Sequence, residues 1–177
     1  LNASPRKNGN TKKVVNAFVQ KHSFKNIVQI DLIDLNMGHC IGCLACSRTG
    51  ECPFNDDMQM VYDAVNTADM IVFSTPIYFN SVTSIGKVAI DRFQRNYAKR
   101  FIRKEWPKVD LNKKGLLIAT AGWKEKNNEF DGLRFPMDLF FKANGIKSYQ
   151  SMIIEDFDKL SSIDIEDKLK SCIQNIE

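Results

Sequence analysis

Short apolar runs alternate with amphipathic stretches along this chain. Four runs are rich in Val, Ile or Leu and cover residues 27–35, 69–75, 115–121 and 147–154. Their length and composition are typical of strands buried on both faces of a parallel sheet. Between them, apolar residues recur at helical spacing. We expect one helix to begin near Asn10 and a second to include the apolar face of 60–65; three more are expected at 84–101, 133–143 and 162–176. This alternation predicts an α/β doubly wound parallel sheet with helices on both faces.

The beginning of the chain predicts one more strand. The first expected helix follows almost directly behind Leu1, Asn2 and Ala3, whereas a doubly wound sheet needs a strand in that place. We therefore expect five parallel strands, of which the first is largely missing from the given chain. No Pro-, Gly- or Ser-rich linker interrupts the pattern, so residues 1–177 are expected to form a single domain.

Composition excludes several classes of protein. The chain has 177 residues, of which 44% are hydrophobic and 26% charged, and none of its apolar runs approaches the roughly 20 residues that span a bilayer. We expect no membrane association and no disordered or fibrous architecture. A domain of this size buries a sufficient core without disulfides, so its five cysteines favour a reducing cytoplasm.

The net charge of +4 is unevenly distributed. Residues 1–25 carry six Lys or Arg and no acid, and residues 92–114 carry nine basic residues against two acids. Such blocks predict either a positive mouth for a phosphate or simply solvated helix faces. The second block has no nucleic-acid-binding motif, so we expect no nucleic-acid partner. Because it includes Phe101 and Trp106, it is also a candidate contact with another subunit.

A polar loop precedes the first helix. It carries short hydroxyl and amide side chains and one guanidinium, supplied by Ser4, Arg6, Asn8, Asn10 and Thr11. Together with the N–H groups of a helix N-terminus, these side chains suit a phosphate. The alternative for this loop alone is a simple capped turn.

Two further loops follow predicted strands at the edge where ligands bind in open α/β sheets. The second loop contains an aromatic pair able to line a conjugated ring, within the residues Pro76, Ile77, Tyr78, Phe79 and Asn80. The third loop, which completes the same crevice, contains Thr120, Ala121, Gly122 and Trp123. The alternative for the aromatic pair is that it plugs the core.

Four cysteines form a cluster, C-x2-C-x2-C-x5-C, within a loop at 38–54. They are Cys40, Cys43, Cys46 and Cys52. The spacing suits the thiolate ligands of a [4Fe-4S] cluster, and thiols without metal or a zinc site are the alternatives. His39 is expected to be a loop residue without a role, and Cys172 a small core residue.

The three loops and the cysteine cluster, in this order, resemble the NAD(P)H-dependent FMN reductase and iron-sulfur flavoprotein family. The matching stretches are NASPRKNGNT at 2–11, the cysteine run from 40 through 58, and TPIYF at 75–79 leading to IDRFQ at 90–94. The resemblance implies a flavodoxin-like fold. It also implies FMN held by its phosphate in the first loop and by its ring between the other two, with a [4Fe-4S] cluster on the four cysteines.

The expected function follows from this resemblance. We expect an oxidoreductase that moves electrons from NAD(P)H through FMN, with or without the cluster, to a small-molecule or protein acceptor. No acid or base residue is needed as a catalytic group, because the flavin carries the chemistry. The alternative is an iron-sulfur flavoprotein that carries electrons between protein partners and has no nicotinamide site. The resemblance also implies a homodimer or homotetramer.

Overall fold

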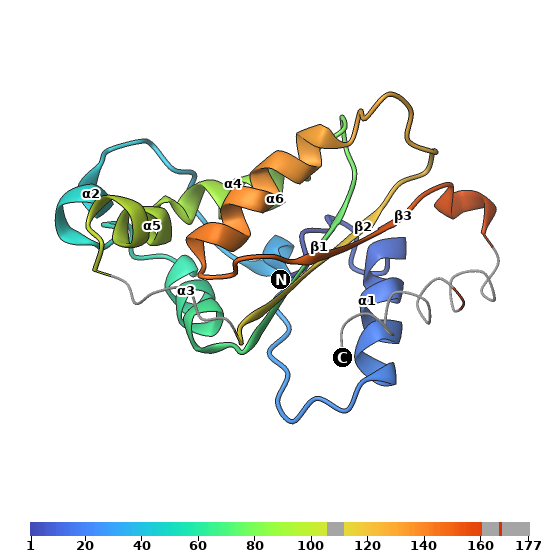
Figure 1. The fold of residues 1–177 in the computed structure, drawn as a ribbon, viewed down its shortest axis with the longest axis horizontal. Helices are drawn as coiled ribbons and strands as arrows, with labels where there is room; N and C mark the ends of the chain where they lie inside the picture. Colours follow the sequence, from blue (N-terminus) through green and yellow to red (C-terminus); the bar gives the residue numbers. More distant parts are fainter. Residues whose placement is uncertain (106–111, 161–166, 168–177) are drawn as a thin grey trace.

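Three parallel strands form the centre of the molecule (Figure 1). The computed structural model describes residues 1–105, 112–160 and 167. The strands are β1 (Met70–Pro76), β2 (Lys114–Thr120) and β3 (Gln150–Ile154), in the order β1-β2-β3. Phe73 pairs with Leu117, and Ile118 pairs with Met152. The expected strands at 69–75, 115–121 and 147–154 are therefore confirmed to within a few residues.

Two shorter extended segments continue this sheet beyond β1. Asn2 forms parallel bridges to Ser74 on one side and to Asp31 on the other. The Asn2 N–H donates to the carbonyl of Ile30 at 2.8 Å, and the Ala3 N–H donates to the carbonyl of Ser74 at 2.7 Å. If the five segments are numbered along the chain, with residues 1–3 as the first and 30–31 as the second, their order across the sheet is 2-1-3-4-5. The winding of the sheet therefore reverses between residues 1–3 and β1. The five-stranded expectation is confirmed in part: three strands form the sheet, and the two other segments contribute only isolated bridges.

The strand expected at 27–35 is wrong for most of its length. Ile27 and Val28 are 48% and 71% exposed, and Leu32–Asp34 forms the 3-10 helix η1. The segment pairs with residues 1–3 through the Asn2–Asp31 bridge, and the chain turns into η1 directly after Asp31.

Helices cover both faces of the sheet, as expected. In the two long described ranges, the helices of four or more residues are α1 (Asn10–Lys21), α2 (Ala45–Thr49), α3 (Met58–Thr67), α4 (Ser84–Arg92), α5 (Gln94–Tyr97), the π-helix η2 (Ala98–Ile102) and α6 (Asp131–Ala143). A 3-10 turn, η3 (Phe157–Lys159), follows β3. Successive residues of β2 serve two cores: Leu117 packs with residues of α3 and α6, whereas Leu116 packs with residues of α1.

The helix expected at 84–101 is interrupted. It ends at Arg92, and the chain turns at Phe93 before α5 and η2 continue. The Phe93 ring lies edge-on against Tyr62 and Phe140, with centroids 5.4 and 5.0 Å apart, and this packing fixes the turn. The helix expected at 162–176, with Cys172, lies outside the described residues except for Asp167, as does Trp106.

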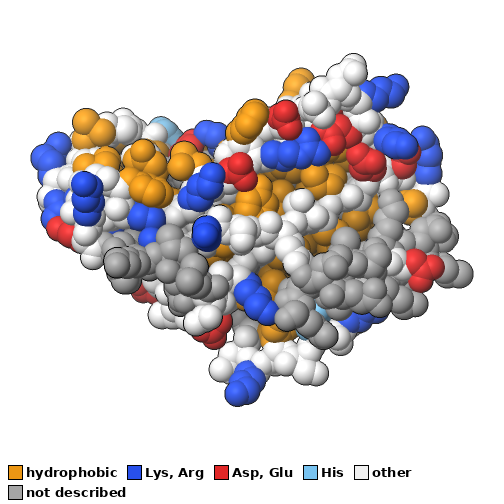
Figure 2. Space-filling view, viewed as in Figure 1, with side chains coloured by type: hydrophobic (Ala, Val, Ile, Leu, Met, Phe, Trp, Pro, Cys, Tyr) orange, Lys and Arg blue, Asp and Glu red, His pale blue; other side chains and the backbone are white. Residues whose placement is uncertain are grey.

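Hydrophobic side chains also reach the surface. Figure 2 shows them over α6 and at the end of the molecule where α2 lies, with Lys and Arg side chains around them. Within the described ranges, no helix has both the length and the apolar character needed to cross a bilayer.

Candidate functional site

The three predicted loops meet at the carboxyl edge of the sheet. The Ile77 N–H donates to the carbonyl of Thr120 at 2.8 Å, which joins the second loop to the third. The hydroxyls of Thr11 and Thr120 lie 2.7 Å apart and are buried, which joins the first to the third. The Thr83 hydroxyl donates to the Ala3 carbonyl at 2.6 Å. The loops therefore form one connected surface beside the point where the winding of the sheet reverses.

The first loop presents an uncapped helix N-terminus. Gly9 is the N-cap residue of α1 and makes no side-chain cap hydrogen bond, so no cap side chain serves the first-turn N–H groups. The loop itself is tight: Ser4 Oγ accepts from the Arg6 N–H at 3.2 Å, and a Cβ on Gly9 would lie 3.0 Å from the Cβ of Arg6. This arrangement suits an anion at the start of α1.

The positive charge of residues 1–25 is partly neutralised. Lys7 pairs with Asp34 at 2.6 Å, and Lys12 pairs with Asp31 at 2.5 Å. Arg6 is exposed, and within the described ranges its guanidinium has no acidic partner. Of the cations in the loop itself, Arg6 is therefore the one available to an incoming phosphate.

The second loop holds its aromatic pair outward. Tyr78 and Ser81 exchange two backbone hydrogen bonds of 3.0 Å, and the residues between them have positive φ angles, 48° at Phe79 and 59° at Asn80. Phe79 is fully exposed and Tyr78 is 42% exposed. The alternative that this pair plugs the core is therefore wrong, whereas the neighbouring Ile77 side chain is buried.

Helix α6 fixes the position of this second loop. The Ser81 hydroxyl donates to the carbonyl of Gly132 at 2.7 Å. A Cβ on Gly132 would lie only 2.6 Å from the carbonyl oxygen of Asn80. Glycine is thus required for the close approach of α6 to the aromatic loop.

The third loop is bound to the segment after β3. Phe157 donates its N–H to the carbonyl of Ala121 at 2.9 Å, and a Cβ on Gly122 would lie 3.1 Å from a carboxylate oxygen of Asp158. The Asn10 side chain donates to the other oxygen of Asp158 at 3.4 Å. The predicted residues Asn10, Ala121 and Gly122 are thereby brought together, with an acid beside them that sequence reasoning had not included.

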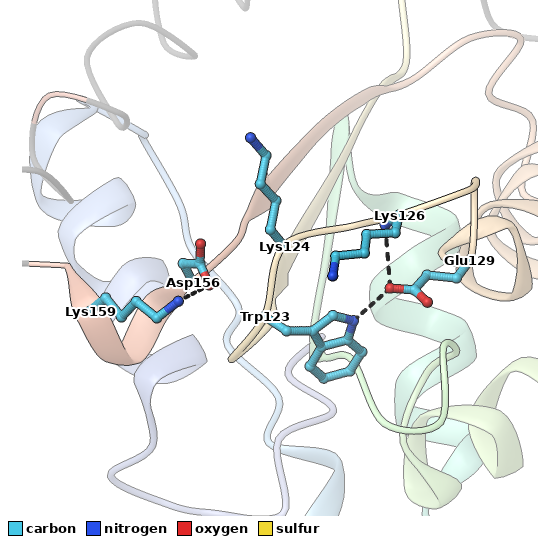
Figure 3. A pocket seen from close by; sticks show the side chains of 6 residues that line it. All are labelled: Trp123, Lys124, Lys126, Glu129, Asp156 and Lys159. Atoms are coloured by element: carbon cyan, nitrogen blue, oxygen red, sulfur yellow. Dashed lines mark hydrogen bonds and ion pairs between the residues drawn. The ribbon is translucent and has the colours of Figure 1, made fainter.

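An open cleft of about 560 Å³ continues outward from the third loop (Figure 3). It is lined by Trp123, Lys124, Lys126, Glu129, Asp156 and Lys159. Glu129 accepts from the Trp123 indole N–H at 3.0 Å, while Lys159 pairs with Asp156 at 3.0 Å. The ammonium groups of Lys124 and Lys126 have no acidic partner among the described residues. Of these residues, Trp123 was predicted as part of the third loop, whereas the two lysines that follow it, Lys124 and Lys126, were not predicted.

The cysteine loop forms a separate feature at the end of the molecule marked by α2 (Figure 1). The backbone adopts positive φ at Gly42, Leu44 and Gly50, which turns it repeatedly. All four cysteines line one small cavity of about 30 Å³, and none of the residues of the three loops lines it. Cys43 is exposed, and the other three are half-buried.

The thiols lie close enough to influence one another electrostatically. Burial raises the pKa of the Cys46 thiol, and the charges of Cys40 and Cys52 add to the rise. In the parts of the chain that are described, no three His, Cys, Asp or Glu side chains are arranged to hold a single metal ion. His39 is exposed, as expected of a loop residue.

The basic block after α4 clamps the cysteine loop. Glu51 pairs with Arg95 at 2.7 Å and also with Lys99. Partial burial would raise the pKa of Glu51, but these two cations hold it below its usual value. Arg103 donates to the carbonyl of Arg48 in α2. Arg95, Lys99 and Arg103 therefore form neither a positive mouth for a phosphate nor a solvated helix face, because they bind groups of the cysteine loop.

A buried ion pair closes the base of the loop. Arg92 is 1% exposed and binds the Asp56 carboxylate through two nitrogens, at 2.5 and 3.0 Å. It also donates to the Gly38 carbonyl at 2.7 Å. Burial would raise the pKa of Asp56, but Arg92 and the N–H groups of Gly38 and Met58 hold it below its usual value. The Asp56 carboxylate also accepts from the Met58 N–H at 3.1 Å.

Comparison with protein families agrees with these features. The model of a family described as NADPH-dependent FMN reductase matches residues 1–153. An iron-sulfur flavoprotein of Clostridioides difficile is 36% identical over 110 residues, which cover 59% of this chain and 48% of the relative. An iron-sulfur flavoprotein of Methanocaldococcus jannaschii is 33% identical over 94 residues, covering 52% and 49%. The chain thus spans about half the length of these curated relatives.

Solved structures establish the fold. An FMN-dependent NADH-azoreductase from Bacillus anthracis, in complex with FMN, superimposes with a TM-score of 0.66 at 16% identity, covering 99% of this chain and 95% of the other. An NAD(P)H:quinone oxidoreductase from Methanothermobacter marburgensis gives a TM-score of 0.69 at 16% identity, covering 97% and 90%. Together with the 2-1-3-4-5 order, these likenesses confirm a flavodoxin-like fold.

Proposed function

The chain belongs to the NADPH-dependent FMN reductase family, and on that basis we propose that it is a flavoprotein oxidoreductase that moves electrons from NAD(P)H through FMN to an acceptor. The observation that carries this proposal is the hydrogen-bonded union of three loops where the winding of the sheet reverses. Flavodoxin-like sheets of this strand order bind FMN at that point.

The residues present suit each part of an FMN molecule. The uncapped N-terminus of α1 and the exposed Arg6 would hold the phosphate. Tyr78 and Phe79 offer ring faces, and the Gly122 backbone offers polar contacts on the other side. When bound, the flavin supplies the electron-accepting ring, and the protein supplies its binding and orientation.

The first test measures FMN affinity by flavin fluorescence quenching. Arg6→Ala removes the phosphate cation, and Thr11→Ala breaks the Thr11–Thr120 hydroxyl pair, so each variant is expected to bind FMN about tenfold more weakly, a loss of about 1.4 kcal/mol. Lys7→Ala is the matched control, because Lys7 already pairs with Asp34. Wild-type affinity in Arg6→Ala and Thr11→Ala would overturn the placement of the phosphate.

We infer that the reduced nicotinamide nucleotide enters through the cleft beside Trp123. The two lysine ammoniums suit its phosphates, and the indole, 37% exposed, suits stacking with a base. The Lys124→Ala/Lys126→Ala double variant is expected to raise KM for the donor about tenfold with kcat unchanged, because these contacts bind ground state and transition state equally. Lys87→Ala, whose ammonium pairs with Asp91 at 2.7 Å, is the control. An unchanged KM would exclude entry of the nicotinamide nucleotide through this cleft.

We also propose that the four cysteines hold a [4Fe-4S] cluster. The two iron-sulfur flavoprotein relatives support this by name, and the cavity shared by four sulfur side chains supports it by chemistry. Arg92 adds support: it lines the same cavity, and its buried Nε has no hydrogen-bond partner among the described residues, so an anionic group there would satisfy it. The alternatives are that the cysteines bind no metal or that they bind zinc, and metal analysis distinguishes these cases.

The cluster also favours a second candidate function, an electron carrier between protein partners. The two functions differ in what reduces the bound flavin under anaerobic conditions. Rapid bleaching of the flavin absorption by NADH or NADPH supports the reductase, whereas bleaching only by a reduced iron-sulfur protein supports the carrier. We expect the first result, because the lysine-lined cleft adjoins the third loop.

A further inference from the structure

Arg92 has a buried guanidinium with one nitrogen unused. Its Nη atoms are engaged by Asp56 and by the Gly38 carbonyl, but its Nε, also buried, has no hydrogen-bond partner in the described parts of the chain. Buried N–H groups are nearly always paired, since an unpaired one loses its hydrogen bond to water without a replacement. The unused donor is therefore a sign that an acceptor belongs beside it.

The surroundings of Arg92 indicate which acceptor this is. Arg92 lines the small cavity that is also lined by the four cysteines. The nearest ring, Phe54, lies with its centroid 4.9 Å from the Arg92 Cζ and offers no hydrogen-bond acceptor in its plane. Four of the side chains that line this cavity carry a sulfur, which can accept a hydrogen bond.

Arg92 also closes the loop that carries the cysteines. Gly38 lies just before the first cysteine and Asp56 just after the last, and a single guanidinium binds both. The Gly38 N–H donates to the same carboxylate at 3.0 Å, so the two ends of the loop are joined directly. The guanidinium plane is therefore held in one orientation, and the direction of its Nε–H is fixed with it.

We propose that Arg92 is a positioning residue of the sulfur site: its Nη atoms clamp the ends of the cysteine loop while its Nε–H donates to a sulfur of the cluster that the loop holds. This inference rests on the cluster proposed above. A hydrogen bond to sulfur and a nearby positive charge both favour the more negative, reduced state, and so raise the reduction potential. Arg92 would thus adjust the potential without touching the flavin.

The test compares Arg92→Lys with wild type after anaerobic reconstitution with iron and sulfide. Lysine keeps the charge and a partner for Asp56 but lacks a planar second donor. We expect an unchanged iron content, a midpoint potential shifted to a more negative value, and an altered EPR spectrum of the reduced protein. Arg134→Lys is the matched control: Arg134 also binds a carboxylate through two nitrogens, that of Glu125, and it does not line the cysteine cavity. The control is expected to keep the wild-type potential.

A second measurement needs no variant and therefore does not depend on the variant folding. Wild-type protein containing 15N-labelled arginine is reduced and studied by pulsed EPR, and a 15N hyperfine coupling to the cluster is expected. Absence of this coupling, or a wild-type potential in folded Arg92→Lys, would overturn the role of Arg92. Wild-type protein that takes up no iron would overturn the proposed cluster and this inference together, while flavin binding would still test the reductase separately.

Discussion

Asp56 is the residue on which the base of the cysteine loop depends most. Its carboxylate accepts from Arg92, from the Gly38 N–H and from the Met58 N–H. The Arg92 side chain is fully buried, so without Asp56 its charge would be left without a carboxylate to balance it. Removing one partner of such a pair is therefore expected to cost much more than removing a surface ion pair.

We expect Asp56→Asn to lower the free energy of unfolding at pH 7 by about 3 kcal/mol. Because the folded state holds the pKa of Asp56 below its usual value, the stabilisation is present above about pH 4 and is lost as the pH falls through the folded value. The difference in the free energy of unfolding between wild type and Asp56→Asn should therefore become smaller as the pH falls below about 4. Urea unfolding at several pH values measures it, with exposed Asp63→Asn as control. A difference that stays constant down to about pH 2 would contradict the assignment.

At the scale of elements, the sequence predicted best what is buried on both faces. Strands β1 and β2 were found from their apolar runs, since such strands leave little room for polar residues. The strand expected at 27–35 was wrong for most of its length, because a local pattern does not distinguish the apolar residues of the 3-10 helix at Leu32–Asp34 from those of a strand. The break at Phe93 was missed because rings distant in sequence cause it. For the same reason the ion pairs between 92–103 and the cysteine loop could not be predicted.

The packing of α6 on the aromatic loop gives a prediction at this scale. Gly132→Ala forces the Asn80 carbonyl to move, because the new Cβ would lie 2.6 Å from its oxygen. We expect FMN affinity to fall about tenfold, about 1.4 kcal/mol, while stability changes little because alanine favours the helix. FMN titration and thermal unfolding measure both quantities. Phe135→Ala, on the exposed face of the same helix, should leave the affinity unchanged. Unchanged affinity in Gly132→Ala would show that α6 does not position the loop.

At the scale of the whole molecule, the two candidate redox sites are held by different parts of the fold. The carboxyl edge of the sheet carries the three loops, whereas α4, α5 and η2 hold the cysteine loop. Exposed Ile41 and Leu44 of the cysteine loop and exposed Phe101 and Ile102 of η2 leave apolar surface on these segments. A homodimer or homotetramer stays a prediction, which sedimentation at micromolar concentration tests.

The measurement that most directly tests the account is the cofactor content of protein purified without oxygen and supplied with FMN, iron and sulfide. We predict about one FMN and about four irons and four sulfides per chain, with flavin absorption bands on a broad shoulder in the blue. Flavin bands without iron would contradict the cluster and leave an FMN reductase. Protein that binds no FMN would contradict the central claim.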